Sequence, residues 1–320
     1  MKKKVLVCGA TGFIGRNIAE YFSKNNNYEV IGVHNKRQIY ECPNLRWVKA
    51  DLTQINDIER VIEGVDIIIQ AAATTTGSKD VVLRPYIHIT DNAVINSLLF
   101  RAAFEKKVKH VLFFSCTVML QTSDRPQTET DYDANSELHP RYFGIANTKL
   151  YIEKMCDFYS RIGETKFTAI RHTNIYGPHD KFDLEKSHVF GATITKVLSA
   201  KDGKVSVWGT GEEARDLLYI DDLISFVEKA IKNQKSPYGL YNCGYGSAIS
   251  IKNLVEKIIA SSGEKLKIEH DLSQPTIKTS LSLDCSKAKT ELNWEPKTSL
   301  DDGIDKTITW WREIFSLSSE

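Results

Sequence analysis

Three glycines, spaced three residues apart, stand near the start of the chain, directly after a short apolar run. The segment Gly9–Gly15 reads Gly-Ala-Thr-Gly-Phe-Ile-Gly and follows Val5–Cys8. Glycines at this spacing allow a tight strand-to-helix turn and let a pyrophosphate approach backbone N–H groups at a helix N-terminus. The segment therefore predicts a dinucleotide site, with a purely structural tight turn as the alternative. The predicted contacts are Gly9, Thr11, Gly12, Phe13, Ile14 and Gly15.

The residues after the second apolar run, Val33-His34-Asn35-Lys36-Arg37, bear on which dinucleotide binds. An acidic side chain at this place usually holds the ribose 2′-hydroxyl of NAD, whereas a 2′-phosphate calls for polar and basic groups. No acid is present here, and Asn35, Lys36 and Arg37 could hold a phosphate. We therefore predict NADP(H) in preference to NAD(H). The alternative is a solvated basic loop.

Short β-branched or aromatic runs alternate with helix-period segments through the first half of the chain. The predicted strands are residues 4–8, 28–33, 45–49, 66–69, 110–114 and 167–171. The predicted helices between them include residues 14–25, 55–63, 92–106 and 148–162. Near-continuous apolar strands separated by helices are typical of a parallel sheet covered on both faces, so we predict an α/β, doubly wound fold.

The pattern loosens after Arg171. Residues 174–211 are rich in Gly, Pro and His, and the tail mixes helical patterns at 251–261 and 300–314 with turns. This predicts a smaller C-terminal substrate-binding lobe built from separated segments, with the ligand in the cleft between the lobes. The predicted division gives residues 1–172 and 216–243 to the dinucleotide-binding domain and residues 173–215 and 244–320 to the substrate-binding lobe.

The composition argues against several other classes of protein. Forty-two Lys+Arg nearly cancel forty-one Asp+Glu, so the net charge of +1 supplies no field for nucleic acid or an anionic membrane. No apolar run reaches the roughly 18 residues of a membrane span. Six cysteines are scattered without C-x-x-C or Cys/His spacing, which argues against a disulfide framework or a metal site. We expect a cytoplasmic protein without a metal.

Several motifs, taken together, resemble a known family. They are the glycine segment, Asp51-Leu52, Ala71-Ala72-Ala73, Asn92, Ser115, Lys149, Arg171–Pro178, Val207–Gly211, Arg215–Asp222 and Leu292–Pro296. Their order and spacing resemble the extended short-chain dehydrogenase/reductases over essentially the whole chain. Within that family, Tyr176–Phe182 followed by Ser187-His188-Val189 looks most like the GDP-L-fucose synthases, which epimerise and reduce a 4-keto GDP-sugar with NADPH.

This resemblance implies a Rossmann-type sheet and a nucleotide-sugar substrate. It also implies a homodimer, in which the helices near Asn92–Lys106 and Thr148–Ile162 pack with those of the partner as a four-helix bundle. The further cofactor contacts that it implies are Asp51, Leu52, Ala71, Ala72, Ala73, Asn92 and Lys149.

The catalytic pair of that family is a tyrosine followed four residues later by a lysine, which binds the nicotinamide ribose and lowers the pKa of the tyrosine. Counting back 25 residues from Asn174 gives Lys149, so Ile145 occupies the tyrosine position. A second register, with Phe143–Asn147 in that place, would lose both members. Tyr142 lies seven residues before Lys149 on the same predicted helix face. It could replace the tyrosine only if the start of the helix is distorted, because seven residues span roughly 10 Å of helix.

Other polar groups complete the catalytic set that the resemblance implies. Ser115 matches the family serine. GDP-L-fucose synthases use a Cys and a His as acid/base partners; Thr117 occupies the Cys position here, and His188 keeps the His position. Cys116 could replace the lost thiol, but adjacent strand residues point to opposite faces, so we expect a buried structural thiol. The predicted catalytic residues are Ser115, Lys149, Tyr142 and His188.

For the sugar nucleotide, Arg215 matches a family residue placed to meet the pyrophosphate, and Lys196 could assist. The second family arginine is Ser280 here, with Lys278 nearby as a possible substitute. Trp208 is expected to pack in the core, with stacking on a nucleotide base as the alternative. The predicted substrate contacts are Thr117, Asn174, His188, Lys196, Trp208, Arg215 and Lys278.

Three hypotheses of function follow. The first is an NADP(H)-dependent oxidoreductase/epimerase acting on a nucleotide-linked sugar, with a 4-keto-6-deoxy sugar favoured. The second is a Rossmann protein that binds cofactor and ligand without turnover, as a sensor or partner protein, and Ile145 keeps it open. The third is an epimerase or dehydratase whose acid/base groups lie elsewhere in the cleft.

Overall fold

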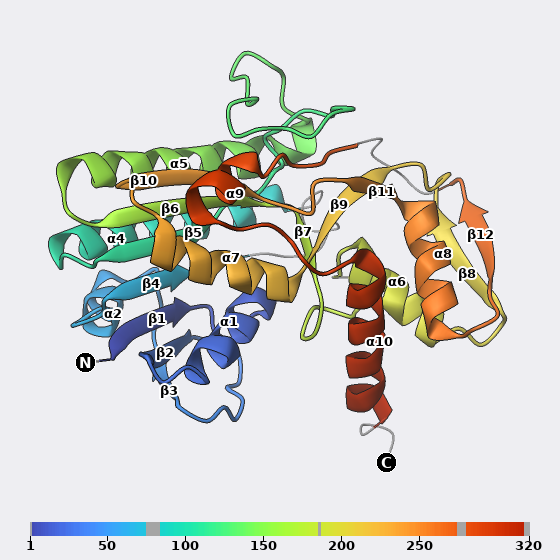
Figure 1. Ribbon diagram of the computed structural model, residues 1–320, viewed down its shortest axis with the longest axis horizontal. Coiled ribbons are helices and arrows are strands. Elements are labelled where there is room, and N and C mark those ends of the chain that lie inside the picture. The colour runs from blue at the N-terminus through green and yellow to red at the C-terminus, as the bar shows by residue number, and fades with distance from the viewer. Residues whose placement is uncertain (1, 75–83, 185–186, 274–279, 317–320) are drawn as a thin grey trace.

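A seven-stranded parallel sheet forms the centre of the N-terminal part of the protein (Figure 1). The computed structural model describes residues 2–74, 84–184, 187–273 and 280–316. Within them the strand order is β10-β6-β5-β4-β1-β2-β3, and every neighbouring pair is parallel. The strands are β1 (Lys3–Cys8), β2 (Tyr28–His34), β3 (Leu45–Lys49), β4 (Ile67–Gln70), β5 (His110–Phe114), β6 (Lys166–His172) and β10 (Tyr238–Cys243). The predicted doubly wound fold is confirmed.

Helices cover both faces of this sheet because alternate strand residues point to opposite sides. Val5 and Val7 of β1 pack in one core with residues of α1 and α7, whereas Leu6 packs in the other core with residues of α2, α4 and α5. The helices are α1 (Phe13–Ser23), α2 (Ile55–Val61), α4 (Thr90–Glu105), α5 (Phe143–Ile162) and α7 (Ile220–Asn233). The carboxyl ends of the strands therefore form the open edge at which a doubly wound fold binds its ligand.

The remaining segments build a second, smaller lobe. Its strands are β7 (Asn174–Tyr176), β9 (Ala214–Tyr219) and β11 (Ala248–Ser250), in the order β11-β9-β7, and the parallel pair β8 (Lys204–Trp208) and β12 (Lys267–Asp271). Its helices are α6 (Val189–Leu198), α8 (Ile251–Ser262) and α10 (Leu300–Ser316). The short helix α9 (Ser286–Leu292) lies instead against the large-sheet part, where Glu291 accepts a hydrogen bond from Tyr241 of β10 and the Leu292 carbonyl oxygen accepts one from Asn233 of α7. The strand β10 returns to the large sheet, and the predicted boundary at residue 216 falls inside β9. The exact division into domains stays a prediction.

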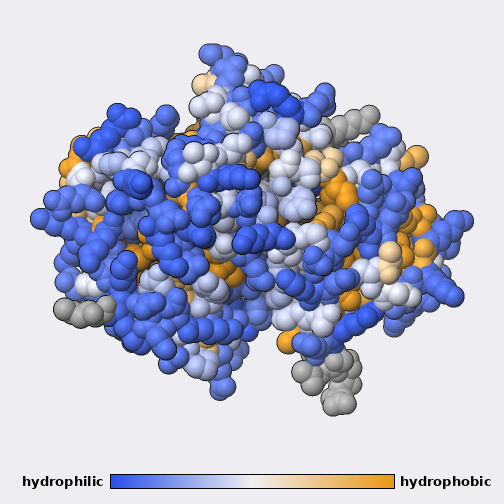
Figure 2. All heavy atoms as spheres, viewed as in Figure 1, coloured by the Kyte–Doolittle hydropathy of each residue, from blue (hydrophilic) through white to orange (hydrophobic). Residues whose placement is uncertain are grey.

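Two short 3₁₀ helices, η1 (Pro85–His88) and η2 (Pro140–Tyr142), precede α4 and α5. Hydrophilic residues cover most of the face shown in Figure 2, and hydrophobic residues appear there in small, separated patches. None of the described helices combines the length and the apolar character needed to cross a membrane.

Candidate active site

The glycine segment connects β1 to α1, as its sequence predicts. Gly9 has a left-handed backbone (φ +73°), and a Cβ there would lie 2.7 Å from Ala72 Cα, so packing alone requires this glycine. Gly12 is different. It is the N-cap of α1 in ordinary extended backbone, and a Cβ would meet only the Gly9 carbonyl oxygen, at 3.3 Å, and Arg37 Nη1, at 4.0 Å. The first turn of α1 contains no acidic residue. Backbone N–H groups without competing acids suit a pyrophosphate.

The basic loop after β2 lies beside this turn. Arg37 Nη1 donates a hydrogen bond to the Thr11 carbonyl oxygen at 3.5 Å, and Arg37 is otherwise exposed. Lys36 interacts with Asp51, whose pKa is held below its ordinary value first by hydrogen bonds from Thr53 and also by this lysine. Asn35 is exposed next to them. The loop thus presents cationic side chains close to the glycine segment, which suits a 2′-phosphate.

The other predicted cofactor residues lie where β3 and β4 end. Leu52 is buried in the core, and the Asp51 carboxylate accepts hydrogen bonds from the Thr53 backbone and hydroxyl.

Asn92, on α4, stabilises the segment after β4. Its amide donates to the carbonyl oxygens of His88 and Thr74 and accepts from Thr74 N–H at 2.9 Å. The backbone of Ala71 and Ala72 lies against Gly9, and Ala73 is exposed. Phe13 and Ile14 are partly buried against the core.

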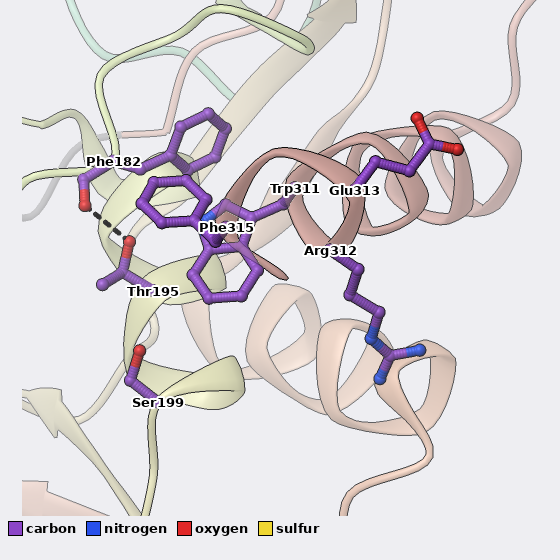
Figure 3. A pocket seen from close by; sticks show the side chains of 7 residues that line it. All are labelled: Phe182, Thr195, Ser199, Trp311, Arg312, Glu313 and Phe315. Atoms are coloured by element: carbon purple, nitrogen blue, oxygen red, sulfur yellow. Dashed lines mark hydrogen bonds between the residues drawn. The ribbon is translucent and has the colours of Figure 1, made fainter. Parts of the chain in front are cut away.

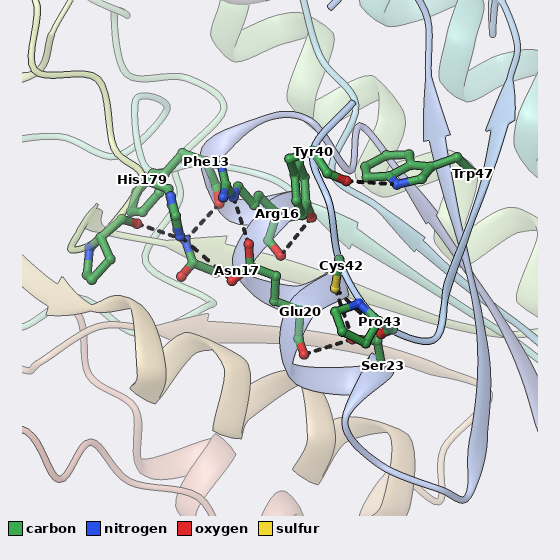
Figure 4. Close-up of polar contacts among 11 residues, drawn as sticks. Phe13, Arg16, Asn17, Glu20, Ser23, Tyr40, Cys42, Pro43, Trp47 and His179 are labelled. Atoms are coloured by element: carbon green, nitrogen blue, oxygen red, sulfur yellow. Dashed lines mark hydrogen bonds and ion pairs between the residues drawn. The ribbon is translucent and has the colours of Figure 1, made fainter. Parts of the chain in front are cut away.

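The helix α1 also contacts the segment that follows β7 (Figure 4). Asn17 Nδ2 donates to the Pro178 carbonyl oxygen at 2.9 Å and to the Phe13 carbonyl oxygen at 3.0 Å. His179 Nε2 lies 3.7 Å from a Glu20 carboxylate oxygen. The helix that begins at the glycine segment is therefore connected directly to the Tyr-Gly-Pro-His-Asp motif.

Lys149 reaches the carboxyl end of β5. Its Nζ donates to the Phe114 carbonyl oxygen at 2.7 Å and lies 4.7 Å from the centre of the Phe113 ring. Ile145 precedes it by one turn on α5, so the two side chains share a helix face. Burial lowers the pKa of Lys149, and the ionisable groups of Cys116 and then Glu153 act against this shift.

Ser115 belongs to a buried network. The residue is 1% exposed, and its hydroxyl donates to Glu153 Oε1 at 2.6 Å. Glu153 in turn forms a buried ion pair with Arg171. The Ser115 proton is therefore engaged inside the protein, and a catalytic role for this residue stays a prediction.

Cys116 departs from our expectation of a buried structural thiol. The strand β5 ends at Phe114, so strict strand alternation no longer governs Cys116, and the residue is partly exposed rather than fully buried. Lys149 is its strongest charged neighbour; burial nevertheless keeps the pKa of the thiol above its ordinary value. The structure therefore adds Cys116 to the groups around Lys149.

His172 was missed by the sequence reasoning. It is the last residue of β6, and its ring centre lies 6.0 Å from that of Phe114. Phe114 is the residue whose carbonyl oxygen accepts the hydrogen bond from Lys149. Burial lowers the pKa of His172 to about 4, and the nearby Lys149 and His188 add to this shift, whereas the hydrogen bond to the Thr173 carbonyl acts against it. The imidazole is therefore neutral at physiological pH. The available signal was its place directly after the predicted strand 167–171, because ligands of a doubly wound fold bind at the carboxyl ends of the strands. His188, exposed at the N-cap of α6, is also close enough to interact with His172.

Tyr142 stands just before the start of α5. It ends the 3₁₀ helix η2, so the start of the helical segment departs from α geometry. Its phenol interacts with Arg215, whose pKa is lowered by burial and raised again by Tyr142. Arg215 also donates through Nη1 to the Ala214 carbonyl oxygen at 2.8 Å. Tyr142 is therefore close enough to the predicted substrate arginine to influence its electrostatics.

The remaining predicted substrate residues are dispersed. The expectation that Trp208 packs in the core is wrong, because it is 51% exposed, with Lys196 Nζ 5.7 Å from its ring centre. Lys196 also donates to the Ser206 carbonyl oxygen at 2.9 Å, and Asn174 Nδ2 donates to the Asp216 carbonyl oxygen at 3.2 Å. Thr117 is partly buried beyond β5. Lys278 lies outside the described residues.

A surface hollow of about 780 Å³ lies between α6 and α10 (Figure 3). None of the predicted site residues lines it. Its walls are Phe182, Thr195, Ser199, Trp311, Arg312, Glu313 and Phe315. The candidate active site is therefore not this hollow. It is the group of side chains at the carboxyl ends of β5 and β6, namely Ser115, Cys116, Lys149 and His172, which we call the Lys149 cluster.

The parallel sheet, the glycine turn and the lysine at the end of β5 define a dinucleotide-binding protein of the doubly wound class. The NAD dependent epimerase/dehydratase family matches residues 5–244, and the chain belongs to that family. The resemblance drawn from the motifs is thereby confirmed.

Relatives match over almost the whole chain. GDP-L-colitose synthase of Yersinia pseudotuberculosis is 27% identical, covering 96% of this chain and 97% of the relative. GDP-L-fucose synthase of Sinorhizobium fredii is 28% identical, covering 95% and 94%. The crystal structure of UDP-glucose 4-epimerase of Thermotoga maritima superposes with a TM-score of 0.86 at 23% identity, covering 98% and 99%. That structure supports the fold.

Proposed function

We propose that this protein is an NADP(H)-dependent enzyme that reduces or epimerises a nucleotide-linked sugar, of the 4-keto-6-deoxy type. The observation that carries the proposal is the position of Lys149. Its ammonium lies at the carboxyl end of β5, 2.7 Å from the Phe114 carbonyl oxygen. Two relatives named for GDP-sugars match 96% and 95% of the chain. The cofactor, when bound, supplies or accepts a hydride.

The residues of this chain suit that chemistry. The open N-terminus of α1 at Gly12 would hold the pyrophosphate, and Arg37 and Lys36 would hold a 2′-phosphate. Lys149 would bind the nicotinamide ribose and supply positive charge. Arg215, with Tyr142 beside it, would hold the pyrophosphate of the sugar nucleotide, and the half-exposed Trp208 offers a face to its base.

The test is NADPH oxidation against a panel of 4-keto nucleotide sugars that carry GDP, UDP or dTDP. We expect turnover with a GDP-sugar and a loss of turnover in Lys149→Met. Lys154→Met provides a matched control, because Lys154 is an exposed lysine on the same helix α5. Absence of turnover with every sugar would overturn the proposal.

A second candidate function is ligand binding without turnover, and Ile145 favours it because the usual phenol is absent. This alternative predicts that the protein binds NADPH and nucleotide sugar but oxidises no NADPH. Restoration of turnover by Ile145→Tyr would support it. An epimerase or dehydratase with differently placed acid/base groups would instead convert the sugar without net NADPH consumption.

We also propose that the protein is a homodimer formed through α4 and α5. The side chains of Tyr151, Phe158 and Ile162 on α5 are 50%, 54% and 50% exposed. Their spacing of seven and four residues places them on one helix face. A second copy packed on this face would complete a four-helix bundle.

A further inference from the structure

The cluster around Lys149 raises the question of which group supplies a proton. Ile145 has none, and the Ser115 hydroxyl is engaged with Glu153. Cys116 follows Phe114 by two residues, and the Phe114 carbonyl oxygen accepts a hydrogen bond from the Lys149 ammonium. Cys116 is partly exposed, and after burial Cys116 and Lys149 each make the largest electrostatic contribution to the pKa of the other.

We propose that the thiol of Cys116 is the proton donor and acceptor of the site, working with Lys149 in place of the phenol that Ile145 lacks. The proposal rests on the proposed function. It assigns the acid/base group to the end of a strand instead of the first turn of α5.

The chemistry of the thiol suits this role. An ordinary thiol has a pKa of about 8.5 and an ordinary phenol about 10, so the two groups are comparable acids. Burial keeps the pKa of Cys116 above its ordinary value although Lys149 opposes this, and Glu153 and Arg171 also act on the thiol from α5 and β6. The thiol is therefore protonated at neutral pH, and a thiolate formed there would lie beside an ammonium group, which stabilises it.

In the reductive direction, a bound NADPH would supply the hydride to the carbonyl carbon of the sugar and would itself become NADP⁺. As the C=O π bond breaks, Cys116 Sγ would give its proton to the carbonyl oxygen, so that an alcohol and a thiolate result. Solvent would then return a proton to the thiolate. In the oxidative direction, the thiolate would accept the hydroxyl proton.

The other groups of the cluster are less suited to give a proton. His172 Nδ1 lies 2.8 Å from the Thr173 carbonyl oxygen, which accepts a hydrogen bond if Nδ1 carries the ring proton. The neutral imidazole then offers only a lone pair at Nε2. A threonine hydroxyl such as that of Thr117 is a far weaker acid than a thiol. His172 is therefore less suited than Cys116 to donate a proton.

The first experiment compares Cys116→Ala and Cys116→Ser with the wild type. We expect NADPH affinity within twofold and turnover about 10²–10⁴-fold lower, the usual contribution of proton transfer. In the wild type, kcat/KM for reduction should fall as the pH rises through the pKa of the thiol, and this alkaline limb should disappear in both variants. Adding Ile145→Tyr to Cys116→Ala should restore part of the turnover. Turnover within twofold of wild type in both single variants, with the limb retained, would overturn the proposal.

The second experiment does not depend on turnover. Iodoacetamide labelling, read by peptide mass mapping, would follow Cys116 with the partly buried Cys42 as the internal control. We expect NADPH plus GDP to slow alkylation of Cys116 at least tenfold and leave Cys42 unchanged, and Lys149→Met to slow alkylation of Cys116 at pH 8. If wild type reduces no nucleotide sugar, the proposed function fails. A Cys116 thiol that the ligands do not protect overturns the present inference in either case.

Discussion

The Arg171 guanidinium and the Glu153 carboxylate form a two-pronged ion pair inside the protein. Arg171 Nε donates to Glu153 Oε1 at 3.0 Å and Nη2 donates to Oε2 at 2.7 Å, with both side chains at most 4% exposed. Ser115 donates to the same Oε1, and Arg171 Nη1 donates to the Glu129 carbonyl oxygen at 3.0 Å. This network joins α5 and β6 to the residue that follows β5, one helical turn of α5 away from Lys149.

Removal of one partner should destabilise the fold strongly, because the other charge would stay buried without compensation. We expect Glu153→Gln to lower the free energy of unfolding by about 3 kcal/mol or more, measured by urea denaturation. The control is Glu105→Gln in the exposed Arg101–Glu105 pair, which should cost about 0.5 kcal/mol or less. Equal small losses in both variants would contradict this account.

The cofactor preference should follow the basic loop. NADP(H) should bind at least tenfold more tightly than NAD(H), a difference of about 1.4 kcal/mol, as measured by calorimetric titration. Arg37→Ser should remove most of this difference, because Arg37 lies over the glycine segment. Arg46→Ser, which changes an exposed arginine on the edge strand β3, should leave it intact. Equal affinities of the wild type for the two cofactors would exclude the 2′-phosphate site.

Lys149 should matter more than Tyr142 for turnover. Lys149→Ala should weaken cofactor binding and lower kcat, because it removes the cation at the end of β5. Tyr142→Phe should leave kcat nearly unchanged and raise KM for the sugar nucleotide a few-fold, because Tyr142 lies beside Arg215. Steady-state kinetics separates the two effects. Loss of kcat in Tyr142→Phe with unchanged NADPH affinity would instead indicate a displaced catalytic tyrosine.

Light scattering at micromolar concentration should give twice the monomer mass of 36.2 kDa. Phe158→Glu should shift the protein toward the monomer, since a carboxylate would have to be desolvated in the proposed α4–α5 interface. Leu272→Glu, at a leucine that is 71% exposed beyond β12, should not. A monomeric wild type would refute the proposed dimer.

Stability should depend on pH through Asp180. Its Oδ2 is buried without a hydrogen bond to the described residues, and burial raises the pKa of Asp180 to about 7. The folded state then holds a proton that the unfolded chain releases near its ordinary pKa of about 3.9. Because folding binds this proton, the free energy of unfolding should fall as pH rises from about 4 to 7, by at most roughly 4 kcal/mol.

Asp180→Asn should flatten that decline, since the amide does not titrate. Urea denaturation at about pH 5 and pH 8 would measure the change. Asp124→Asn, at an exposed aspartate, should retain the wild-type slope. An unchanged slope in Asp180→Asn would assign the pH dependence to other groups.

The sequence by itself determined the central sheet and the dinucleotide turn, because both depend on local patterns. Apolar runs such as 4–8 and 110–114 are typical of strands covered on both faces, and the glycine spacing specifies the turn that follows the first of them. The position of Lys149 also follows from the sequence, through its spacing of 25 residues from Asn174 in the family motif. What these patterns specify is the order of the elements and the face that each one buries.

Only the tertiary structure decided which side chains surround Lys149. Past the end of β5, the directions of Cys116 and Thr117 depend on a turn, and strand alternation no longer predicts them. The pairing of Ser115 with Glu153 and the approach of Tyr142 to Arg215 join residues 38 and 73 positions apart in the chain. His172 belongs to the cluster only because β6 lies beside β5 in the sheet. Contacts between distant segments depend on how the helices and loops pack, and that packing decided the chemistry of the site.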